Sequence, residues 1–300
     1  MSTTVATRQP HGRRALTPMQ LLLHFAMLLC ALSFLMPLFL VVSASFTSEK
    51  AISSNGYSLF PSKFSVAAYR YVISDPSQLI QSYGVSILVT FVGTVLSVLV
   101  MALLGYVLSR RNFKARRALS FYVLFTMLFG GGLVPSYILM TKYLHLQNTI
   151  WALILPNLVI PWNVLLLRTF FSQLPEGVLD AARIDGAGEW RTFFRIALPM
   201  ATPAIATIGM FTMLMYWNDW WLGLLYIDNP ALSPVQLWLY HILSSIDSVS
   251  QNPIFASGGA VPVQSVRMAV AVLAIGPIVA AFVFFQKYFV RGITLGGIRE

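Results

Sequence analysis

The residues whose types and spacing suit chemistry lie in one polar segment between two long apolar stretches. Asp180 stands before two alanines, Gly186 follows the second alanine by four residues, and Pro199 ends the segment. An acid, small side chains and a glycine turn suit the docking of another protein better than catalysis, which needs paired acid, base or nucleophilic groups. The candidate docking residues are Glu176, Asp180, Ala181, Ala182, Arg183, Asp185, Gly186, Ala187, Ile196, Leu198 and Pro199.

This segment is predicted to form two short helices joined at a glycine. Pro175 suits the first turn of a helix, where Glu176 places negative charge near the positive end of the dipole. Asp180 and Arg183 are three residues apart and can face each other. Gly186 suits the left-handed conformation that ends a helix, and a second helix is expected over roughly 189–196. The alternative is a capped surface connector without a partner.

Three sequence patterns of enzymes are missing from the chain. It has no H-E-x-x-H, no G-x-S-x-G and no Gly-Lys-Ser/Thr phosphate loop, so we expect no catalytic residues, no ATPase site and no cofactor of its own. The single cysteine, Cys30, excludes an internal disulfide and is expected to be a buried apolar residue.

The composition predicts a membrane protein. The 300 residues are 57% hydrophobic and only 10% charged, whereas soluble domains carry about 25% charged residues. About 20 apolar residues are needed to cross a bilayer, and helices satisfy their own backbone polar groups in lipid. We therefore predict an all-α membrane fold, with residues 19–290 as one transmembrane domain. Its six spans are expected at about 19–42, 83–108, 119–140, 150–170, 204–225 and 266–289.

The distribution of charge predicts which side each connection faces. Of the 20 basic residues, 15 lie before the first window, in the connections 2–3 and 4–5, after the sixth window, or, for Arg168 and Lys287, at the adjoining end of a window. The positive-inside rule then places residues 1–18, the docking segment at 171–203 and the tail at 291–300 in the cytoplasm. The basic stretch 110–117 is expected to set topology beside anionic lipid rather than to bind nucleic acid. The first window is too long for a signal peptide, so it is expected to stay uncleaved.

Polar residues inside the windows are candidates for a transport path, because they are costly in lipid. An aromatic belt explains tryptophans near an interface, but it does not explain the neighbouring amide and carboxylate. Such groups beside aromatic faces suit a sugar. In the fourth window, asparagines next to Pro156 and Pro161 either satisfy freed backbone groups or line a cavity. The candidates are Trp162, Asn163, Trp217, Asn218, Asp219 and Trp220.

Other positions leave alternatives open. The glycines 130–132 in the third window indicate either close helix packing or a break that lines a cavity. His24 is expected to make an interhelical hydrogen bond. Ser233-Pro234 predicts the start of an outer helix over 236–246. Lys142, His145 and Arg267 lie near the predicted outer face, where they favour an acidic substrate or simply extend from helix ends.

The docking segment resembles the EAA loop of permease subunits of ATP-binding-cassette importers. The similarity rests on Asp180-Ala181-Ala182, Gly186 and Ile196-x-Leu198-Pro199, and the chain resembles the family over roughly residues 20 to 300. Leu174-Pro175-Glu176 is similar to the carbohydrate, MalG-like branch. Gly130–Pro135 and Tyr216–Trp221 are similar to its LplC-like group. Asp180 stands where this family usually has Glu, so Glu176, one turn earlier, is expected to share its role.

The resemblance implies a transport subunit with several partners. The EAA loop would dock as a coupling helix onto one of two separate ATP-binding subunits, which hold ATP and Mg. A second, different permease would complete the pathway for a sugar or oligosaccharide, with an acidic one or a non-sugar solute as alternatives. A substrate-binding protein would contact Gln236, Trp238 and His241. An ion-coupled transporter is disfavoured, because Asp219 is the only acid inside the windows.

Overall fold

The computed structural model describes residues 17–250 and 262–296, with side chains up to residues 248 and 282 of these two parts. Most of the predicted tail 1–18 and the last residues of the predicted tail 291–300 lie outside the described residues. Within them the chain is helical, and its β structure is a single isolated bridge between Thr47 and Phe64.

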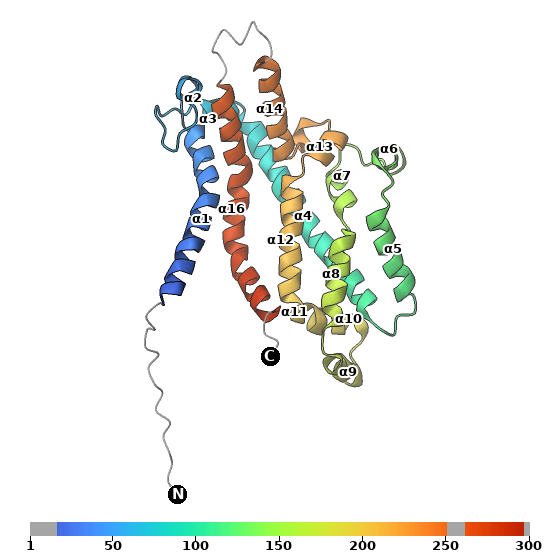
Figure 1. Cartoon of the computed structure of the whole chain (residues 1–300). Helices are drawn as coiled ribbons and strands as arrows, with labels where there is room; N and C mark the ends of the chain where they lie inside the picture. Colours follow the sequence, from blue (N-terminus) through green and yellow to red (C-terminus); the bar gives the residue numbers. More distant parts are fainter. Residues whose placement is uncertain (1–16, 251–261, 297–300) are drawn as a thin grey trace.

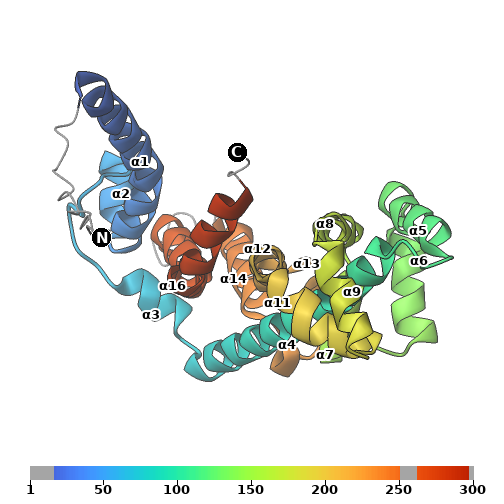
Figure 2. The same ribbon diagram turned by 90° about the horizontal axis from the view of Figure 1, so that it is seen from below.

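Six helices form the body of the molecule, and they run roughly alongside one another (Figure 1). In the view from below, α1 lies at one end of the bundle and α5 at the other (Figure 2). The six are α1 (Pro18–Ser45), α4 (Pro76–Ser109), α5 (Arg116–Leu128), α8 (Pro161–Ser172), α12 (Thr202–Asn218) and α16 (Val263–Gly296). Helix α1 begins, and α16 ends, at the end of the bundle where α9 (Glu176–Ile184) and α10 (Glu189–Thr192) lie.

Three of the predicted spans are single helices, and three are broken. In the described residues, helices α1, α4 and the part of α16 up to Phe282 are each long and apolar enough to cross a membrane. Three further pairs of helical segments pass the same test together. Arg116–Leu128 and Leu133–Tyr143 meet at 111°, Ile150–Asn157 and Pro161–Ser172 at 53°, and Glu189–Met200, in the docking segment, meets Thr202–Asn218 at 81°. By length and composition the chain thus has up to six spans.

The third predicted span, over 119–140, is broken at its glycines, which was one of the two alternatives left open by the sequence. Helix α5 ends at Leu128, and α6 (Leu133–Ile138) starts after the glycines at an angle of 111°. Gly132 has a φ of +85°, which favours glycine. A Cβ on Gly130 or Gly131 would meet nothing within 4 Å, so these glycines break the helix and are not packed closely against other described residues of this chain.

The spans predicted over 150–170 and 204–225 also consist of more than one helix. Helix α7 (Ile150–Ile154) passes into a short 3-10 turn, and α8 starts at Pro161, because a proline ring has no N–H for the preceding turn. Helix α12 stops at Asn218, and α13 (Trp221–Tyr226) follows. There the Asp219 carboxylate accepts a hydrogen bond from the Leu222 N–H at 3.0 Å and caps the new helix.

Helix α4 is the centre of the bundle and packs against both α8 and α12. Small residues allow the close approach. A Cβ on Gly93 would lie 2.8 Å from the Tyr216 ring, and one on Gly105 would lie 2.9 Å from Leu167. The Tyr216 hydroxyl lies 2.9 Å from Ser97 Oγ and donates to the Ile154 carbonyl at 3.0 Å. A buried polar contact thereby joins α4, α7 and α12.

Helix α1 stands apart and touches mainly α16. Cys30 is exposed on it, so its expected burial is wrong for this chain. His24 contacts its own helix through the Gln20 carbonyl, 2.5 Å from Nδ1, instead of making the expected interhelical bond. At the other end of the molecule, α14 (Val235–Ser250) confirms the helix predicted after Ser233-Pro234.

Candidate functional site

The docking segment has the predicted helix–glycine–helix shape. Helix α9 ends at Gly186, whose φ of +76° is left-handed, and the Ala187 N–H donates back to the Ala182 carbonyl at 2.9 Å. Helix α10 then runs through a π turn at Phe193–Ala197 into α11 (Leu198–Met200). The positive φ and the back-bonded N–H groups close the end of α9, as expected for a glycine in this position.

The outward face of this segment is more apolar than predicted. Ile184 is 87% exposed and Trp190 is 69% exposed, and Trp190 stacks on Phe194 with ring centres 6.0 Å apart. Asp180 and Ala181 are exposed on α9, whereas Ala182 is only 7% exposed and packs inward with Leu179. Ala182 therefore does not form the shallow surface expected of both alanines. Large exposed apolar side chains on a polar segment indicate a protein contact.

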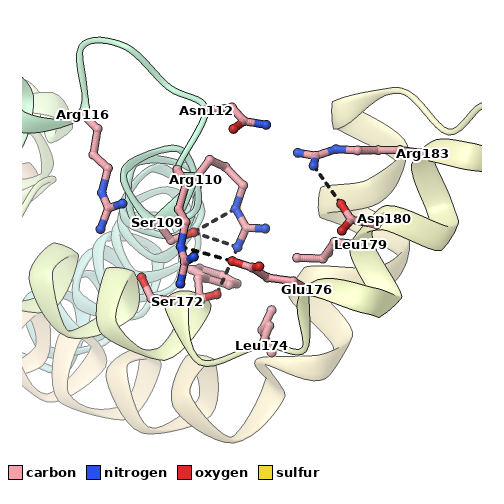
Figure 3. A pocket seen from close by; sticks show the side chains of 12 residues that line it. Ser109, Arg110, Asn112, Arg116, Ser172, Leu174, Glu176, Leu179, Asp180 and Arg183 are labelled. Atoms are coloured by element: carbon pink, nitrogen blue, oxygen red, sulfur yellow. Dashed lines mark hydrogen bonds and ion pairs between the residues drawn. The ribbon is translucent and has the colours of Figure 1, made fainter.

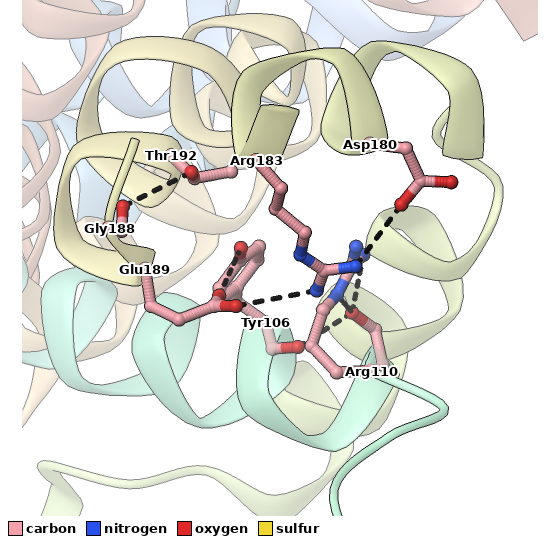
Figure 4. A network of polar contacts seen from close by, with 8 residues as sticks. Tyr106, Arg110, Asp180, Arg183, Gly188, Glu189 and Thr192 are labelled. Atoms are coloured by element: carbon pink, nitrogen blue, oxygen red, sulfur yellow. Dashed lines mark hydrogen bonds and ion pairs between the residues drawn. The ribbon is translucent and has the colours of Figure 1, made fainter. Parts of the chain in front are cut away.

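Glu189 joins the two short helices to α4 (Figure 4). Its Oε1 accepts from Arg183 at 3.3 Å, and its Oε2 accepts from the Tyr106 hydroxyl at 3.0 Å. Arg183 also donates to Asp180 at 3.2 Å. Burial opposes the charge of Arg183, but Glu189 and Asp180 outweigh it and raise the pKa of the guanidinium. Glu189 is not among the docking residues predicted from the sequence, although an acid directly after Gly188 suits a helix start.

A second set of contacts comes from the residues after α4. Arg110 donates to the Phe171 carbonyl at 3.0 Å, and its guanidinium lies 4.7 Å from the centre of the Tyr106 ring. Arg111 pairs with Glu176 at 3.2 Å, and both side chains are mostly exposed. Polar groups of α4, α5, α8 and α9 surround a cavity of about 320 Å³, including Ser109, Arg116, Ser172 and Arg183 (Figure 3). The start of the docking segment is thus tethered to the basic 110–117 stretch.

Two of the transport-path candidates in the fifth window are used inside the fold. Trp217 is buried and donates from its indole N–H to the Ala274 carbonyl at 3.0 Å. Asp219 accepts from the Asn157 amide at 3.1 Å, so the Asn157 amide group serves this side chain rather than a freed backbone carbonyl. The other two reach the surface. Asn218 is exposed, and Trp220 stacks on Tyr240 with ring centres 4.6 Å apart.

The candidates in the fourth window lie on different faces of α8. Asn163 is 8% exposed, whereas Trp162 is 59% exposed. Trp162 begins a largely apolar groove of about 390 Å³ that follows the helix to Gln173. The structure therefore does not gather the six transport-path candidates into one surface.

The predicted contacts for a binding protein lie at the end of the bundle opposite α9 (Figure 1). Trp238 and His241 line a cavity of about 200 Å³ together with Asp228. Gln236 is partly buried, and its amide nitrogen has no hydrogen-bond partner among the described residues. Arg267 is paired with Asp247, so its charge is compensated.

Comparison with known proteins identifies the family of this chain. The family model described as binding-protein-dependent transport system inner membrane component matches residues 101–295, which include α8, the docking segment and α12. The chain belongs to this family. The permease is accordingly an inner membrane component of an ATP-binding-cassette transport system, and the resemblance carried by its EAA-like loop is confirmed at the level of the family.

Relatives of the permease match nearly its whole length. Protein LplC of Bacillus subtilis is 38% identical over 265 residues, which cover 88% of this chain and 89% of the relative. The polygalacturonan/rhamnogalacturonan transport system permease protein YtcP of the same organism is 37% identical, covering 93% and 97%. A bacterial ABC transporter involved in the import of the acidic polysaccharide alginate has a solved chain that superposes with a TM-score of 0.76 at 26% identity. That match covers 94% of the permease and 100% of the solved chain.

Proposed function

We propose that the permease forms half of the import pathway for an oligosaccharide and that its docking segment couples this pathway to a separate ATPase. The observation that carries the proposal is the exposed Ile184 and Trp190 face, which Glu189 ties to α4. A rigid apolar face can transmit a movement of the ATPase, because its anchoring residues move together with the central helix of the bundle. Membership of the family supports the assignment to a binding-protein-dependent transport system.

The proposed assembly contains further subunits. A second permease of different sequence would complete the pathway, two ATP-binding subunits would hold ATP and Mg, and a substrate-binding protein would meet the Trp238 and His241 surface. The start of α1, the end of α16 and the docking segment lie on one side of the bundle, which supports a cytoplasmic position for all three. This orientation also agrees with the basic residues of the 110–117 stretch, because positive charge favours the cytoplasmic side.

The substrate proposal rests on relatives and on exposed aromatic groups. The names of YtcP and of the alginate transporter both refer to polysaccharides, and AraQ of Halalkalibacterium halodurans, 31% identical over 88% of this chain, refers to arabinooligosaccharides. On this chain Asn218 is exposed, close in sequence to the stacked Trp220, and offers hydrogen bonds beside an apolar ring. If the oligosaccharide is acidic, Lys142 and His145 are exposed and available to contact it, whereas Arg267 is already paired with Asp247.

The coupling proposal is tested by Ile184→Asp in the whole transporter. If Ile184 is a hot-spot residue at the centre of the interface, its loss costs about 2 kcal/mol, so we expect the ATPase to bind about thirtyfold more weakly. Co-purification of the ATPase and ATP-dependent oligosaccharide uptake in vesicles should both be lost, while the permease stays in the membrane. Val66→Asp, which adds the same charge at an exposed outer residue, is the control. Normal co-purification of the Ile184→Asp transporter would refute docking through this face.

A further inference from the structure

A second cavity lies beside the docking segment, where the start of α5 meets α8. It measures about 660 Å³ and is lined by Arg111, Phe113, Lys114, Arg116, Arg117, Ser120 and Arg168. We call it the basic cavity. Every charged side chain in this lining is a cation. Within the described parts of the chain, no carboxylate lies within 4.0 Å of the charged groups of Lys114, Arg116, Arg117 or Arg168. Clustered cations repel one another, so a bound anion would stabilise the site.

Ser120 also lines this cavity. The Ser120 Oγ atom is buried and has no hydrogen-bond partner among the described residues, a situation that costs free energy unless a ligand or water fills it. The side chain of Ala115, which precedes α5, cannot cap the N–H groups of the first turn. Cations and uncapped backbone donors together suit the oxygens of a phosphate group.

The surroundings of the cavity indicate which phosphate it holds. Helix α5 has no buried residue, and Phe121, Tyr122 and Phe125 on it are 68%, 63% and 44% exposed. These apolar side chains begin directly after Ser120, so a phosphate in the cavity would have an apolar surface next to it for attached acyl chains. We propose that the basic cavity binds the headgroup phosphate of an anionic phospholipid. The cations of the cavity would attract this phosphate at the membrane surface.

This site would communicate with the docking segment through one shared arginine. Arg111 lines the basic cavity and also pairs with Glu176 on α9. The pair is mostly exposed and therefore weak, so a lipid phosphate competes with Glu176 for Arg111. The lipid composition of the membrane thus changes how firmly the start of α9 is held, in addition to any effect on the insertion of the chain.

The test is a titration of the detergent-purified transporter with phosphatidylglycerol, followed by native mass spectrometry. In the variant Arg117→Gln with Arg168→Gln we expect the affinity for phosphatidylglycerol to fall roughly thirtyfold, since each cation near an anionic lipid surface contributes about 1 kcal/mol. The control is Lys63→Gln with Lys142→Gln, which removes two exposed cations elsewhere and should bind normally. Arg117→Lys with Arg168→Lys keeps the charge and should retain most of the binding.

Three outcomes would overturn the proposal. One is unchanged binding of phosphatidylglycerol by the glutamine variant. Another is displacement of the lipid by inorganic phosphate at equal concentration, which would mean that the site serves a soluble anion. The third is loss of the ATPase subunit from the glutamine variant with normal lipid binding, which would assign these cations to a protein contact. None of these measurements requires transport, so the lipid site can fail while the proposed function stands.

Discussion

Replacing Glu189 by Ala should loosen the docking segment far more than replacing Glu176 by Ala. Glu189 accepts from Arg183 and from the Tyr106 hydroxyl, whereas Glu176 has a single, largely exposed pair with Arg111. From the sequence alone, Glu176 is predicted to have a role in docking and Glu189 is not. The structure predicts that Glu189 anchors the docking segment more strongly than Glu176, whereas the sequence suggests the reverse. The two variants distinguish these predictions.

The contacts of each acid set the expected size of the effect. The Arg183 side chain is 38% exposed and that of Glu189 62%, so this ion pair is discounted to about 0.5 kcal/mol. The bond from the Tyr106 hydroxyl to a carboxylate contributes about 1.5 kcal/mol, at the low end for a charged acceptor, because it is only part-buried. Glu189→Ala should thus cost about 2 kcal/mol, or roughly thirtyfold in the local opening constant. Glu176→Ala should cost about 0.5 kcal/mol or less.

Hydrogen exchange of the purified transporter measures this difference directly. The amides of α9 and α10 should exchange about thirtyfold faster in Glu189→Ala and about twofold faster in Glu176→Ala, with α4 itself unchanged. In vesicles the first variant should hydrolyse ATP with less substrate imported per ATP. Glu189→Gln, which keeps an acceptor for Tyr106, should fall between the two. Equal exchange in the two alanine variants, or a larger effect at Glu176, would refute Glu189 as the main tether.

Two glycine substitutions, each with a control, test the fold around the site by thermal denaturation. Gly186→Ala places a side chain at a φ of +76° and should lower the free energy of unfolding by about 1 to 2 kcal/mol. Its control, Gly188→Ala, has a φ of −67° and open space around the new side chain, so it should have little effect. Gly93→Ala puts a Cβ 2.8 Å from the Tyr216 ring and should cost about 1 to 3 kcal/mol, whereas Gly84→Ala meets nothing within 4 Å and should stabilise α4 by up to about 1 kcal/mol. Equal thermal stability within either pair would contradict the assigned glycine roles.

The breaks in the helices show which features of the fold local sequence patterns can predict and which they cannot. The apolar windows predicted where helices lie, because the amount of apolar chain needed in a bilayer is a property of each segment alone. Whether Gly130–Gly132 served packing or a break depended on neighbours, and open space around two of these glycines decides for the break. Asp219 lies at the break between α12 and α13, and its carboxylate accepts a hydrogen bond from Asn157, which lies 62 residues earlier.

The sequence by itself determined the helical class, the family and the helix–glycine–helix shape of the docking segment. These depend on local composition, on spacing and on the backbone freedom of Gly186. Only the tertiary structure decided which side chains of that segment face outward and what anchors it. Ala182 is buried and Ile184 exposed because of how α9 lies against the bundle, and Tyr106 reaches Glu189 across 83 residues of sequence. Contacts between distant residues arise from packing, which no single segment encodes.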